Sequence, residues 1–372
     1  MQPVEHNRIE CLDGLRGIAA LWVLVGHATL LTGYRLPVIS QPDLGVDLFI
    51  MLSGFLMVFH YQLRRAKEPW ERSSTWRSFW VRRYFRIAPL YYVAMVVALI
   101  AGPVLFEARS TIAEVIPAMA QDPDRFTDRS PANFLMHFSF LFGLHPTYAY
   151  RTALPDWSIG LEMQFYAAFP FAMLALVRLG WVKGAVAIAL VGAAAGVAIN
   201  RWLHFPMPSF LLLKLHVFLA GMLTAAALLL EKRHAWTLGA VALAIVLIPV
   251  GGDRDIAHLI GRVIIAALFF CLVHYRHLPA GLSTAVALIA RALGQRFFYW
   301  LGELSYGAYL IHLLVLTPVA AWLITTESPA KRFGLALLIT IAATYTLATV
   351  CRLLIEIPGQ RLGKNVVARM KP

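Results

Sequence analysis

The first apolar stretch of the chain carries two ionisable side chains, Arg16 and His27, eleven residues apart. At 100° per residue, a helix returns to within about 20° of its starting direction over that interval, so both side chains share one face, about 16 Å apart. Ionisable groups deep in an apolar helix usually face a cavity or a partner, and an imidazole there could accept a proton in catalysis. The alternative is a histidine hydrogen-bonded to a neighbouring helix, with Arg16 extending to the interface.

A run of eight basic side chains between positions 64 and 86 is the second group suited to chemistry. Arg82 and Arg86 are four residues apart and share a helical face, with Arg83 beside them. Guanidinium groups arranged in this way can hold phosphates. Tryptophans at positions 70, 76 and 80 are interleaved with them, and this composition is also typical of a basic loop that anchors a membrane protein.

A polar stripe follows on a later apolar segment, where Ser158, Glu162 and Tyr166 are spaced by four residues on one helical face. A carboxylate within an apolar helix needs a partner, and a histidine would serve. The alternative is a structural ion pair or hydrogen bond between helices. The spacing is compatible with both roles.

Other polar residues are less specific. Tyr306, Tyr309 and His312 lie on one apolar segment, and such residues more often hydrogen-bond neighbouring helices than catalyse reactions. The pair Ser53 and Gly54 would permit close approach of two backbones. Three further polar residues stand singly within apolar segments, and these are Lys214, His216 and Arg262. The sequence does not show whether they line a cavity or pack against other helices.

Membrane helices must position these residues, because the composition excludes a soluble protein. Hydrophobic residues make up 59% of the 372-residue chain and charged residues 14%, with a mean hydropathy of +0.67, whereas a soluble domain carries about a quarter charged residues. The formal charge of +13 then indicates loop charges that orient the chain, or an anionic ligand, rather than nucleic acid. Three scattered cysteines suggest neither a disulfide framework nor a metal site.

Ten apolar runs approach the roughly 20 residues that a helix needs to cross a bilayer. They predict an all-α fold, a polytopic membrane helix bundle with about ten transmembrane helices in a single domain, 1–372. The predicted spans are approximately 14–33, 44–63, 87–106, 157–178, 181–199, 208–230, 236–250, 256–275, 300–324 and 333–356. The apolar segment 133–145 is too short to cross, so we expect it to be re-entrant or interfacial.

The distribution of basic residues predicts the orientation of the bundle. Counted over alternating loops, Lys and Arg number 20 on one side and 9 on the other, and the richer side is cytoplasmic. Both termini are therefore predicted to be cytoplasmic. The N-terminus lacks a basic region followed by a small-residue cleavage site, so we expect the first apolar segment to be retained as a helix.

Five motifs, taken in order along the chain, resemble those of the membrane acyltransferase-3 family, whose multi-pass members O-acylate sugars and related acceptors. Each motif is weak alone, but together they cover nearly the whole chain. One small departure is Ile50, where the family commonly has an aromatic residue. The motifs are residues 12–17 with His27, then 45–55, 82–91, 157–166 and 304–312.

The resemblance implies an acyl-CoA donor, usually acetyl-CoA, and a hydroxyl acceptor on a sugar, polysaccharide or glycolipid, with no permanently bound cofactor and no metal. His27 matches the essential histidine of the family and Arg16 the arginine that accompanies it. Arg82, Arg83 and Arg86 match the arginine motif proposed to engage the CoA phosphates. We expect the remaining motif residues to contact the substrates, and these are Trp157, Ser158, Tyr166, Tyr306, Tyr309 and His312.

The mechanism we expect uses a neutral His27 to remove a proton from the acceptor hydroxyl as it attacks the thioester, while Glu162 orients the imidazole. Asp13 is about 21 Å from His27 along the helix, but at three residues from Arg16 it can steady that cation on the donor side. A covalent acyl-histidine relay is the rival mechanism.

A second class of function is a non-enzymatic transporter that flips a lipid-linked sugar, using the same intramembrane polar residues as its pathway. In either case the partners are the lipid bilayer and a sugar-containing substrate, with no nucleic acid, and the location is the cell membrane, the inner membrane in a bacterium. The acceptor, the acyl chain length and the oligomeric state do not follow from the sequence.

Overall fold

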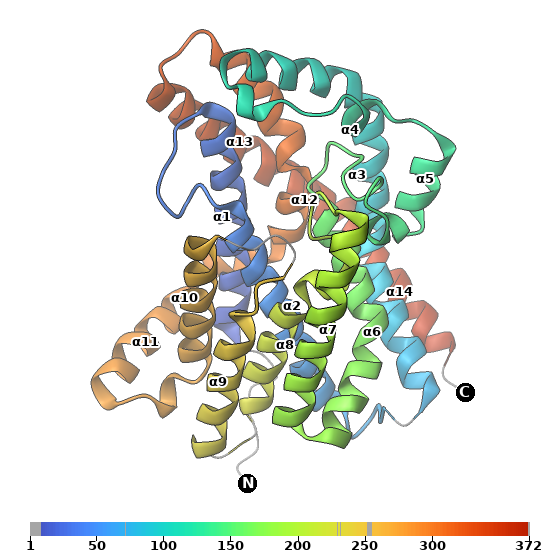
Figure 1. The fold of residues 1–372 in the computed structure, drawn as a ribbon, viewed down its shortest axis with the longest axis vertical. Helices are drawn as coiled ribbons and strands as arrows, with labels where there is room; N and C mark the ends of the chain where they lie inside the picture. The colour runs from blue at the N-terminus through green and yellow to red at the C-terminus, as the bar shows by residue number, and fades with distance from the viewer. Residues whose placement is uncertain (1–8, 71, 229, 231, 251–254, 371–372) are drawn as a thin grey trace.

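Long helices run side by side through the molecule, and shorter helices and loops cover one end (Figure 1). This computed structural model describes residues 9–370 except 71, 229, 231 and 251–254. Over these residues the secondary structure is helical throughout, which confirms the all-α prediction. The α-helices are α1 (Glu10–Thr32), α2 (Pro42–Arg64), α3 (Ser73–Val115), α4 (Asp124–Thr127), α5 (Pro131–Phe138), α6 (Trp157–Leu179), α7 (Trp181–Leu203), α8 (Leu211–Ala227), α9 (Lys232–Val246), α10 (Ile256–Val273), α11 (Ala280–Leu293), α12 (Arg296–Ile324), α13 (Pro329–Cys351) and α14 (Ile357–Arg369).

Short helical turns complete the secondary structure. Three are 3₁₀ turns, which are η1 (Pro117–Met119), η2 (Leu141–Leu144) and η3 (Tyr275–His277). The fourth, η4 (Arg352–Glu356), is a π-helical turn that joins α13 to α14. Single π-helical turns within helices are often found at functional sites.

Eight helices of the described residues are long and apolar enough to cross a membrane, which confirms a polytopic helical membrane protein. They correspond to eight of the ten predicted spans. The predicted spans 208–230 and 236–250 form α8 and α9, which have 17 and 15 residues and fall short of this length. Nearly every side chain of α8 is buried, so this helix packs against protein rather than lipid.

Helix α3 is the largest departure from the predicted boundaries, because it covers 43 residues where the sequence predicts a span at 87–106. It continues through Pro89 and Pro103, and at 1.5 Å per residue it is about 65 Å long, roughly twice the thickness of the hydrocarbon core. The arginine motif therefore lies within the first turns of a continuous helix rather than in the basic loop that precedes it.

Among the described residues, four short α-helices lie outside the predicted spans, and these are α4, α5, α11 and α14. The apolar segment 133–145 forms α5 and η2, which are too short to cross a bilayer, as predicted. Helix α11 falls between two predicted spans and was not expected. It exposes Leu282, Leu288 and Ile289.

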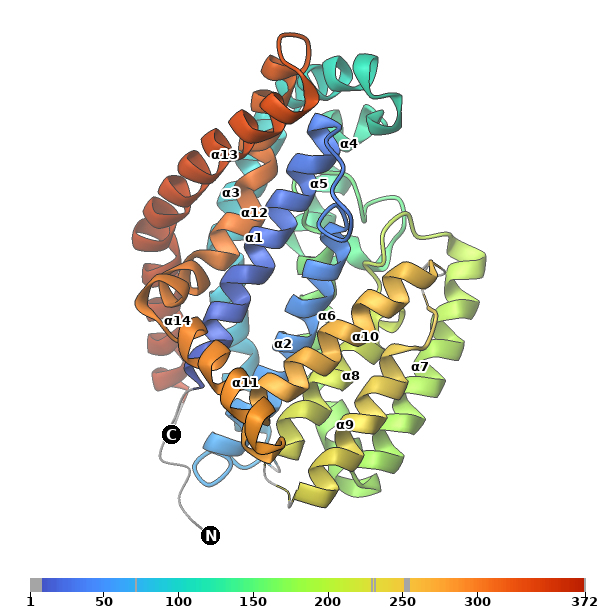
Figure 2. The same cartoon turned by 90° about the vertical axis from the view of Figure 1, so that its left-hand side faces the viewer.

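Helix α1 begins and α14 ends in the lower half of both views (Figures 1 and 2). This is the end of the bundle that carries the basic loop between α2 and α3. The cytoplasmic placement of both termini, and the assignment of the chain to a single domain, stay predictions.

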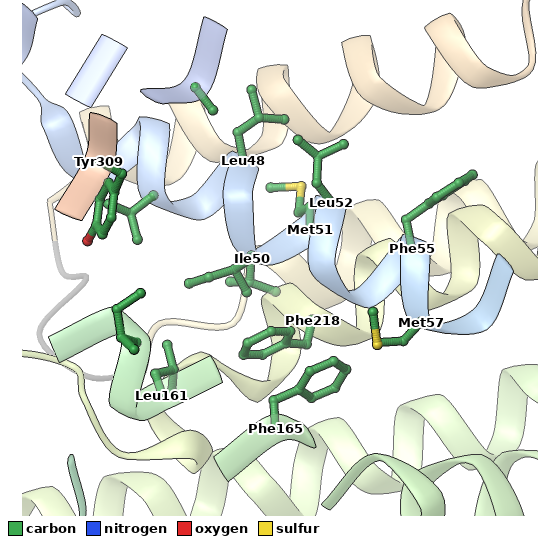
Figure 3. Packing of buried hydrophobic residues seen from close by; sticks show 14 of the residues in the cluster. Leu48, Ile50, Met51, Leu52, Phe55, Met57, Leu161, Phe165, Phe218 and Tyr309 are labelled. Carbon is green, nitrogen blue, oxygen red and sulfur yellow. The ribbon is translucent and has the colours of Figure 1, made fainter. Parts of the chain in front are cut away.

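Packing around α2 forms much of the core. Leu48, Met51 and Phe55 of α2 project among the neighbouring helices (Figure 3), and the rings of Phe165 and Phe218 stack with their centroids 3.9 Å apart. This stack joins α6 to α8 beside α2. The core therefore holds together the helices that surround the polar residues of interest.

Glycines allow two pairs of helices to approach backbone to backbone. A Cβ on Gly54 of α2 would overlap the carbonyl oxygen of Phe218 in α8, and a Cβ on Gly302 of α12 would overlap the carbonyl oxygen of Asp13 in α1. The close approach predicted for the pair Ser53 and Gly54 is thus confirmed.

Candidate active site

A cavity of about 360 Å³ brings together side chains from α1, α2, α3, α6, α8, α12 and α14. Its apolar wall includes Phe49, Ile50 and Phe218. The polar lining residues are Arg16, Ser53, His60, Arg83, Arg86, Ser158, Glu162, Tyr166, Glu303, Ser305, Tyr306, Tyr309 and Gln360. Eight of the thirteen predicted site residues are among them, although their motifs are far apart in the sequence.

Three arginines give the cavity a cationic region. Arg83 and Arg86 lie three residues apart on α3, so they face the same side of that helix, and Arg16 contributes from α1. The guanidinium group of Arg83 lies over the rings of Phe79 and Tyr166, 5.7 Å from each centroid. Its Nε atom is buried and has no hydrogen-bond partner among the described residues, so this donor is available to a ligand.

Arg82 departs from the predicted arrangement. Its two terminal nitrogens donate to the carboxylate of Glu68, at 3.1 and 2.7 Å, and its side chain does not line the cavity. Arg82 lies four residues from Arg86, but only one of this pair reaches the cavity. The prediction that Arg82 acts with Arg83 and Arg86 on phosphates is therefore not supported by the geometry.

Glu162 lines the cavity and is held by two hydroxyl groups. Ser53 of α2 donates to its Oε1 atom at 3.0 Å, and Tyr166, one turn later on α6, donates to the same oxygen. The structure thus gives Glu162 different partners from the predicted one, His27. The four-residue spacing explains the contact with Tyr166, whereas the contact with Ser53 depends on how α2 and α6 pack.

His27 of α1 instead contacts a second histidine, His312 of α12. The Nδ1 atom of His27 lies 3.0 Å from the Nε2 atom of His312, and the ring centroids are 5.0 Å apart. The Nδ1 atom of His312 lies 2.7 Å from the carbonyl oxygen of Tyr309. His312 is completely buried, and neither histidine lines the cavity.

Tyr309 connects the cavity to the histidine pair. Its ring lines the cavity and lies 6.1 Å from that of His312, centroid to centroid. Its hydroxyl group donates to the carbonyl oxygen of Pro155 at 2.7 Å and lies 2.7 Å from the hydroxyl of Ser158. The start of α6 is thereby tied to α12.

The remaining predicted site residues have structural contacts. Tyr306 lines the cavity, and its hydroxyl donates to the carbonyl oxygen of Ile87 at 2.8 Å. Trp157, the first residue of α6, is buried and does not line the cavity. Asp13 does not line it either, but its charge acts on Arg16, as its spacing predicts.

Two carboxylates near the cavity were not among the predicted site residues. Glu303 lines it and pairs with Arg352. Glu356 is 2% exposed, has no hydrogen-bond partner for either oxygen among the described residues, and lies 4.0 Å from Arg86. The signal that could have found Glu356 is its position at the end of the last predicted span, because ionisable residues in such segments are functional candidates.

The loop that follows α3 folds over the upper part of the bundle (Figure 1). Together with α3 it forms a second buried polar cluster. Asp156 accepts hydrogen bonds from Tyr91 at 3.1 Å and from Thr152 at 2.8 Å, and His137 lies 3.6 Å away. Burial raises the pKa of the Asp156 carboxyl, against the opposing effect of His137. This cluster orders the segment that leads into Ser158.

Arg125 belongs to the same loop. Its guanidinium group lies 3.6 Å from the centroid of the Tyr150 ring and donates to Gln121 at 2.5 Å. Burial lowers the pKa of this guanidinium group. The charges of Arg125 and of Arg109 at the end of α3 act on His27, so the loop contributes to the surroundings of the histidine pair.

Lys214, His216 and Arg262, whose roles the sequence leaves open, belong to an ionic network instead of lining the cavity. The carboxylate of Asp47 lies 2.9 Å from the Lys214 ammonium group and 2.7 Å from the Nε atom of Arg262. His216 lies 3.2 Å from Arg262. This network ties α2 to α8 and α10, on the side of α2 that faces away from the cavity.

A comparison with protein families decides where this arrangement belongs. The model of the acyltransferase domain that defines the acyltransferase-3 family matches residues 9–352, which is most of the chain. The chain belongs to this acyltransferase family. All five motifs named above begin and end within the matched residues.

Several acyltransferases are similar in sequence to this family member. The peptidoglycan O-acetyltransferase OatA of Listeria monocytogenes is 23% identical over 95% of this chain and 56% of its own length. The acyltransferase MdmB of Streptomyces mycarofaciens is 25% identical over 84% of this chain and 80% of its own length. A putative O-acetyltransferase of Staphylococcus aureus, SACOL0978, is 28% identical over 49% of this chain and 28% of its own length.

The chain thus spans only about half the length of OatA and less of the staphylococcal protein. No solved structure gives a significant match. The similarity therefore supports the family and leaves substrates to be argued from the site.

Proposed function

We propose that the protein is a membrane O-acyltransferase that moves an acyl group, most simply acetyl, from acyl-CoA to a hydroxyl group of a sugar, polysaccharide or glycolipid. The observation that carries this proposal is a cavity with a cluster of arginines in its lining and a tyrosine whose ring lies beside the buried His312, which contacts His27. Membership of the acyltransferase family and relatives named as O-acetyltransferases support the reaction type.

The donor is assigned from the charge of the cavity. CoA carries a diphosphate and a 3′-phosphate, and guanidinium groups bind phosphates through paired, charge-assisted hydrogen bonds. Arg16, Arg83 and Arg86 line the cavity together, and Arg83 keeps an unpartnered buried Nε donor. The orientation predicted from the loops would place this region toward the cytoplasm, where CoA is made.

His27 is assigned the proton transfer. The thioester arm would extend through the cavity past Tyr309 toward His27, which removes the proton of the acceptor hydroxyl as its oxygen attacks the thioester carbonyl. Glu162 then has another role than orienting the imidazole, because its charge acts on Arg16 and Arg83 within the cavity. It balances part of the positive charge of the proposed donor site.

The acceptor is assigned to the loop between α3 and α6. This loop contributes Arg125, whose charge acts on His27, and leads directly into Ser158. Peptidoglycan is the acceptor given in the name of OatA. For this chain the proposal is limited to a hydroxyl group on a carbohydrate-containing acceptor.

Purified protein in lipid nanodiscs tests the proposal. We expect it to bind acetyl-CoA and to release CoA thiol when a carbohydrate acceptor is added, and we expect His27→Ala to bind acetyl-CoA with little change but to lose thiol release. A folded protein that binds no acyl-CoA, or a His27→Ala variant with full transfer, would contradict the enzyme. Translocation of a lipid-linked sugar without CoA would favour the transporter instead.

The same preparation separates direct transfer from an acyl-histidine relay. Incubation with radiolabelled acetyl-CoA in the absence of acceptor leaves no label on the protein if His27 acts only as a base. Label retained by the wild type and lost in His27→Ala would favour the relay.

A further inference from the structure

His27 and His312 are joined in a chain of hydrogen bonds that ends on the protein backbone. The carbonyl oxygen of Tyr309 lies 2.7 Å from Nδ1 of His312, and Nε2 of His312 lies 3.0 Å from Nδ1 of His27. His312 is 0% exposed, so protein groups must satisfy both of its ring nitrogens. The direction of the two bonds can be deduced from what each group is able to donate.

A carbonyl oxygen only accepts hydrogen bonds, so Nδ1 of His312 must carry a proton. A neutral imidazole has one N–H group and one lone pair, which leaves Nε2 of His312 as an acceptor. The hydrogen bond between the two rings then requires Nδ1 of His27 to be the donor. By the same rule, the lone pair of His27 lies on Nε2.

A second proton on either ring would change this assignment, but it would place a positive charge in the buried interior of the bundle. The neutral arrangement is therefore the one that the surroundings favour.

We propose that His312 is a positioning residue that holds His27 as its Nδ1–H tautomer and so leaves Nε2 as the atom that accepts the proton. The chemical consequence rests on the proposed function. The proton of the acceptor O–H passes to Nε2 of His27 while the oxygen forms a bond to the thioester carbonyl carbon. The carbon–sulfur bond then breaks, its electron pair stays on sulfur, and the CoA thiolate takes the proton from Nε2 to give the thiol and the ester.

His312 also stabilises the charged form of its neighbour during that step. Once Nε2 is protonated, the Nδ1–H group of His27 belongs to a cation, and a hydrogen bond from a charged donor is stronger than one between neutral groups. The acceptor is a neutral ring, so the bundle does not have to bury an additional carboxylate. Glu162, which is engaged by Ser53 and Tyr166, is not needed for this role.

The backbones of α1 and α12 make the pair possible, because these helices lie side by side along much of their length (Figure 2). Gly302 lies where a Cβ would overlap the carbonyl oxygen of Asp13, and Gly17 lies against Leu301. Two to three helical turns beyond these contacts, His312 and His27 meet across the same interface.

Two substitutions of similar polarity separate positioning from packing. In His312→Gln, the terminal amide oxygen can occupy the place of Nε2 and accept from His27. In His312→Asn, the shorter amide can replace only Nδ1 and reaches the carbonyl of Tyr309. We expect kcat to fall by about 10²–10³-fold in His312→Asn and by no more than about tenfold in His312→Gln, with KM for acetyl-CoA unchanged in both.

An exposed histidine supplies the matched control, since His234→Gln makes the same change on the surface of α9. This control should retain wild-type kcat and KM. Equal loss of kcat in His312→Gln and His312→Asn, or a change confined to KM, would overturn the positioning role.

A measurement without substrates tests the tautomer directly. In protein labelled with ¹⁵N-histidine, the signals lost in His27→Gln identify the two ring nitrogens of His27. We expect a protonated Nδ1 and an unprotonated Nε2 in the wild type, and a mixture of both tautomers in His312→Asn. A wild-type His27 with its proton on Nε2 would overturn the proposal.

The two measurements distinguish the positioning role of His312 from the proposed transferase activity. Absence of acyl transfer together with the Nδ1–H tautomer would reject the transferase and leave the positioning geometry intact. Active transfer with the proton on Nε2 would reject the positioning role and leave the transferase intact.

Discussion

The hydroxyl groups of Ser158 and Tyr309 lie 2.7 Å apart, where α6 meets α12. Tyr309 also donates to the carbonyl oxygen of Pro155, so its ring is held in one position. Tyr309 lines the cavity, and its ring lies 6.1 Å from that of His312, centroid to centroid. Tyr309 therefore lies beside both the space proposed for the donor and the histidine pair.

Replacing Tyr309 by alanine should allow water to reach the histidine pair. We expect the ratio of acetyl-CoA hydrolysis to acetyl transfer to rise by about tenfold or more, because exclusion of water protects reactive groups from side reactions. Thiol release measured with and without acceptor gives this ratio. Tyr345→Ala is the control, since Tyr345 is equally buried but does not line the cavity. An unchanged ratio in Tyr309→Ala would show that the ring is not a barrier.

Arg83→Ala and Arg86→Ala should weaken donor binding. A charge-assisted hydrogen bond contributes about 1.5–3 kcal/mol, which corresponds to an increase of about 10–100-fold in KM for acetyl-CoA. Steady-state kinetics over a range of acetyl-CoA concentrations, at a fixed acceptor concentration, measure this KM.

Arg82→Ala provides the sharpest comparison for that prediction, because Arg82 is engaged by Glu68 outside the cavity. We expect its KM to stay within about threefold of the wild type, as for Arg77→Ala on the exposed face of α3, since partly exposed ion pairs contribute little. If Arg82→Ala raised KM for acetyl-CoA more than Arg83→Ala or Arg86→Ala, Arg82 would have to bind the donor phosphates.

Much of the site could be predicted from residue type and spacing within single helices. The interval between Ser158, Glu162 and Tyr166 placed their side chains on one face, and Glu162 and Tyr166 are hydrogen-bonded. The pair Ser53 and Gly54 indicated a close helix contact, which the structure contains. These relationships depend only on helix geometry, so the sequence is sufficient to find them.

Relationships between helices could not be found in that way. His27 contacts His312 rather than Glu162, because the packing of α1 against α12 decides which polar groups meet. Arg82 was predicted to act with Arg86 from helical spacing, but Glu68, in the short loop before α3, binds it outside the cavity. Glu356 lies in the π-helical turn that joins α13 to α14, 4.0 Å from Arg86, and hydropathy carries no sign of such a turn.

Asp47→Asn should destabilise the protein by disrupting the buried ionic network that joins α2 to α8 and α10. The two oxygens of Asp47 bind Lys214, His258 and Arg262, all from other helices. Removing one partner of a buried ionic group typically costs about 3–5 kcal/mol, because the opposite charges stay buried. Thermal unfolding of purified protein in detergent measures the loss, with Glu114→Gln on an exposed face of α3 as the control. A melting temperature equal to that of the control would mean that the network does not join these helices.

Gly54→Ala should also destabilise the protein, because Gly54 lies at a close contact between helices. Alanine is favoured over glycine in a helix by about 1 kcal/mol, so the substitution alone would stabilise α2. The added Cβ would, however, overlap the carbonyl oxygen of Phe218 in α8, and overpacking of this kind costs about 1–3 kcal/mol.

Gly334→Ala supplies the matched comparison, because Gly334 lies within α13 and a Cβ there would have no neighbour within 4 Å. We expect thermal unfolding to show a lower melting temperature for Gly54→Ala and an unchanged or higher one for Gly334→Ala. Gly54→Ala should in addition raise KM for acetyl-CoA, since a shift of α2 away from α8 would displace Ser53, which donates to Glu162 in the cavity. Equal stabilisation by both substitutions would show that α2 and α8 are not in backbone contact at this glycine.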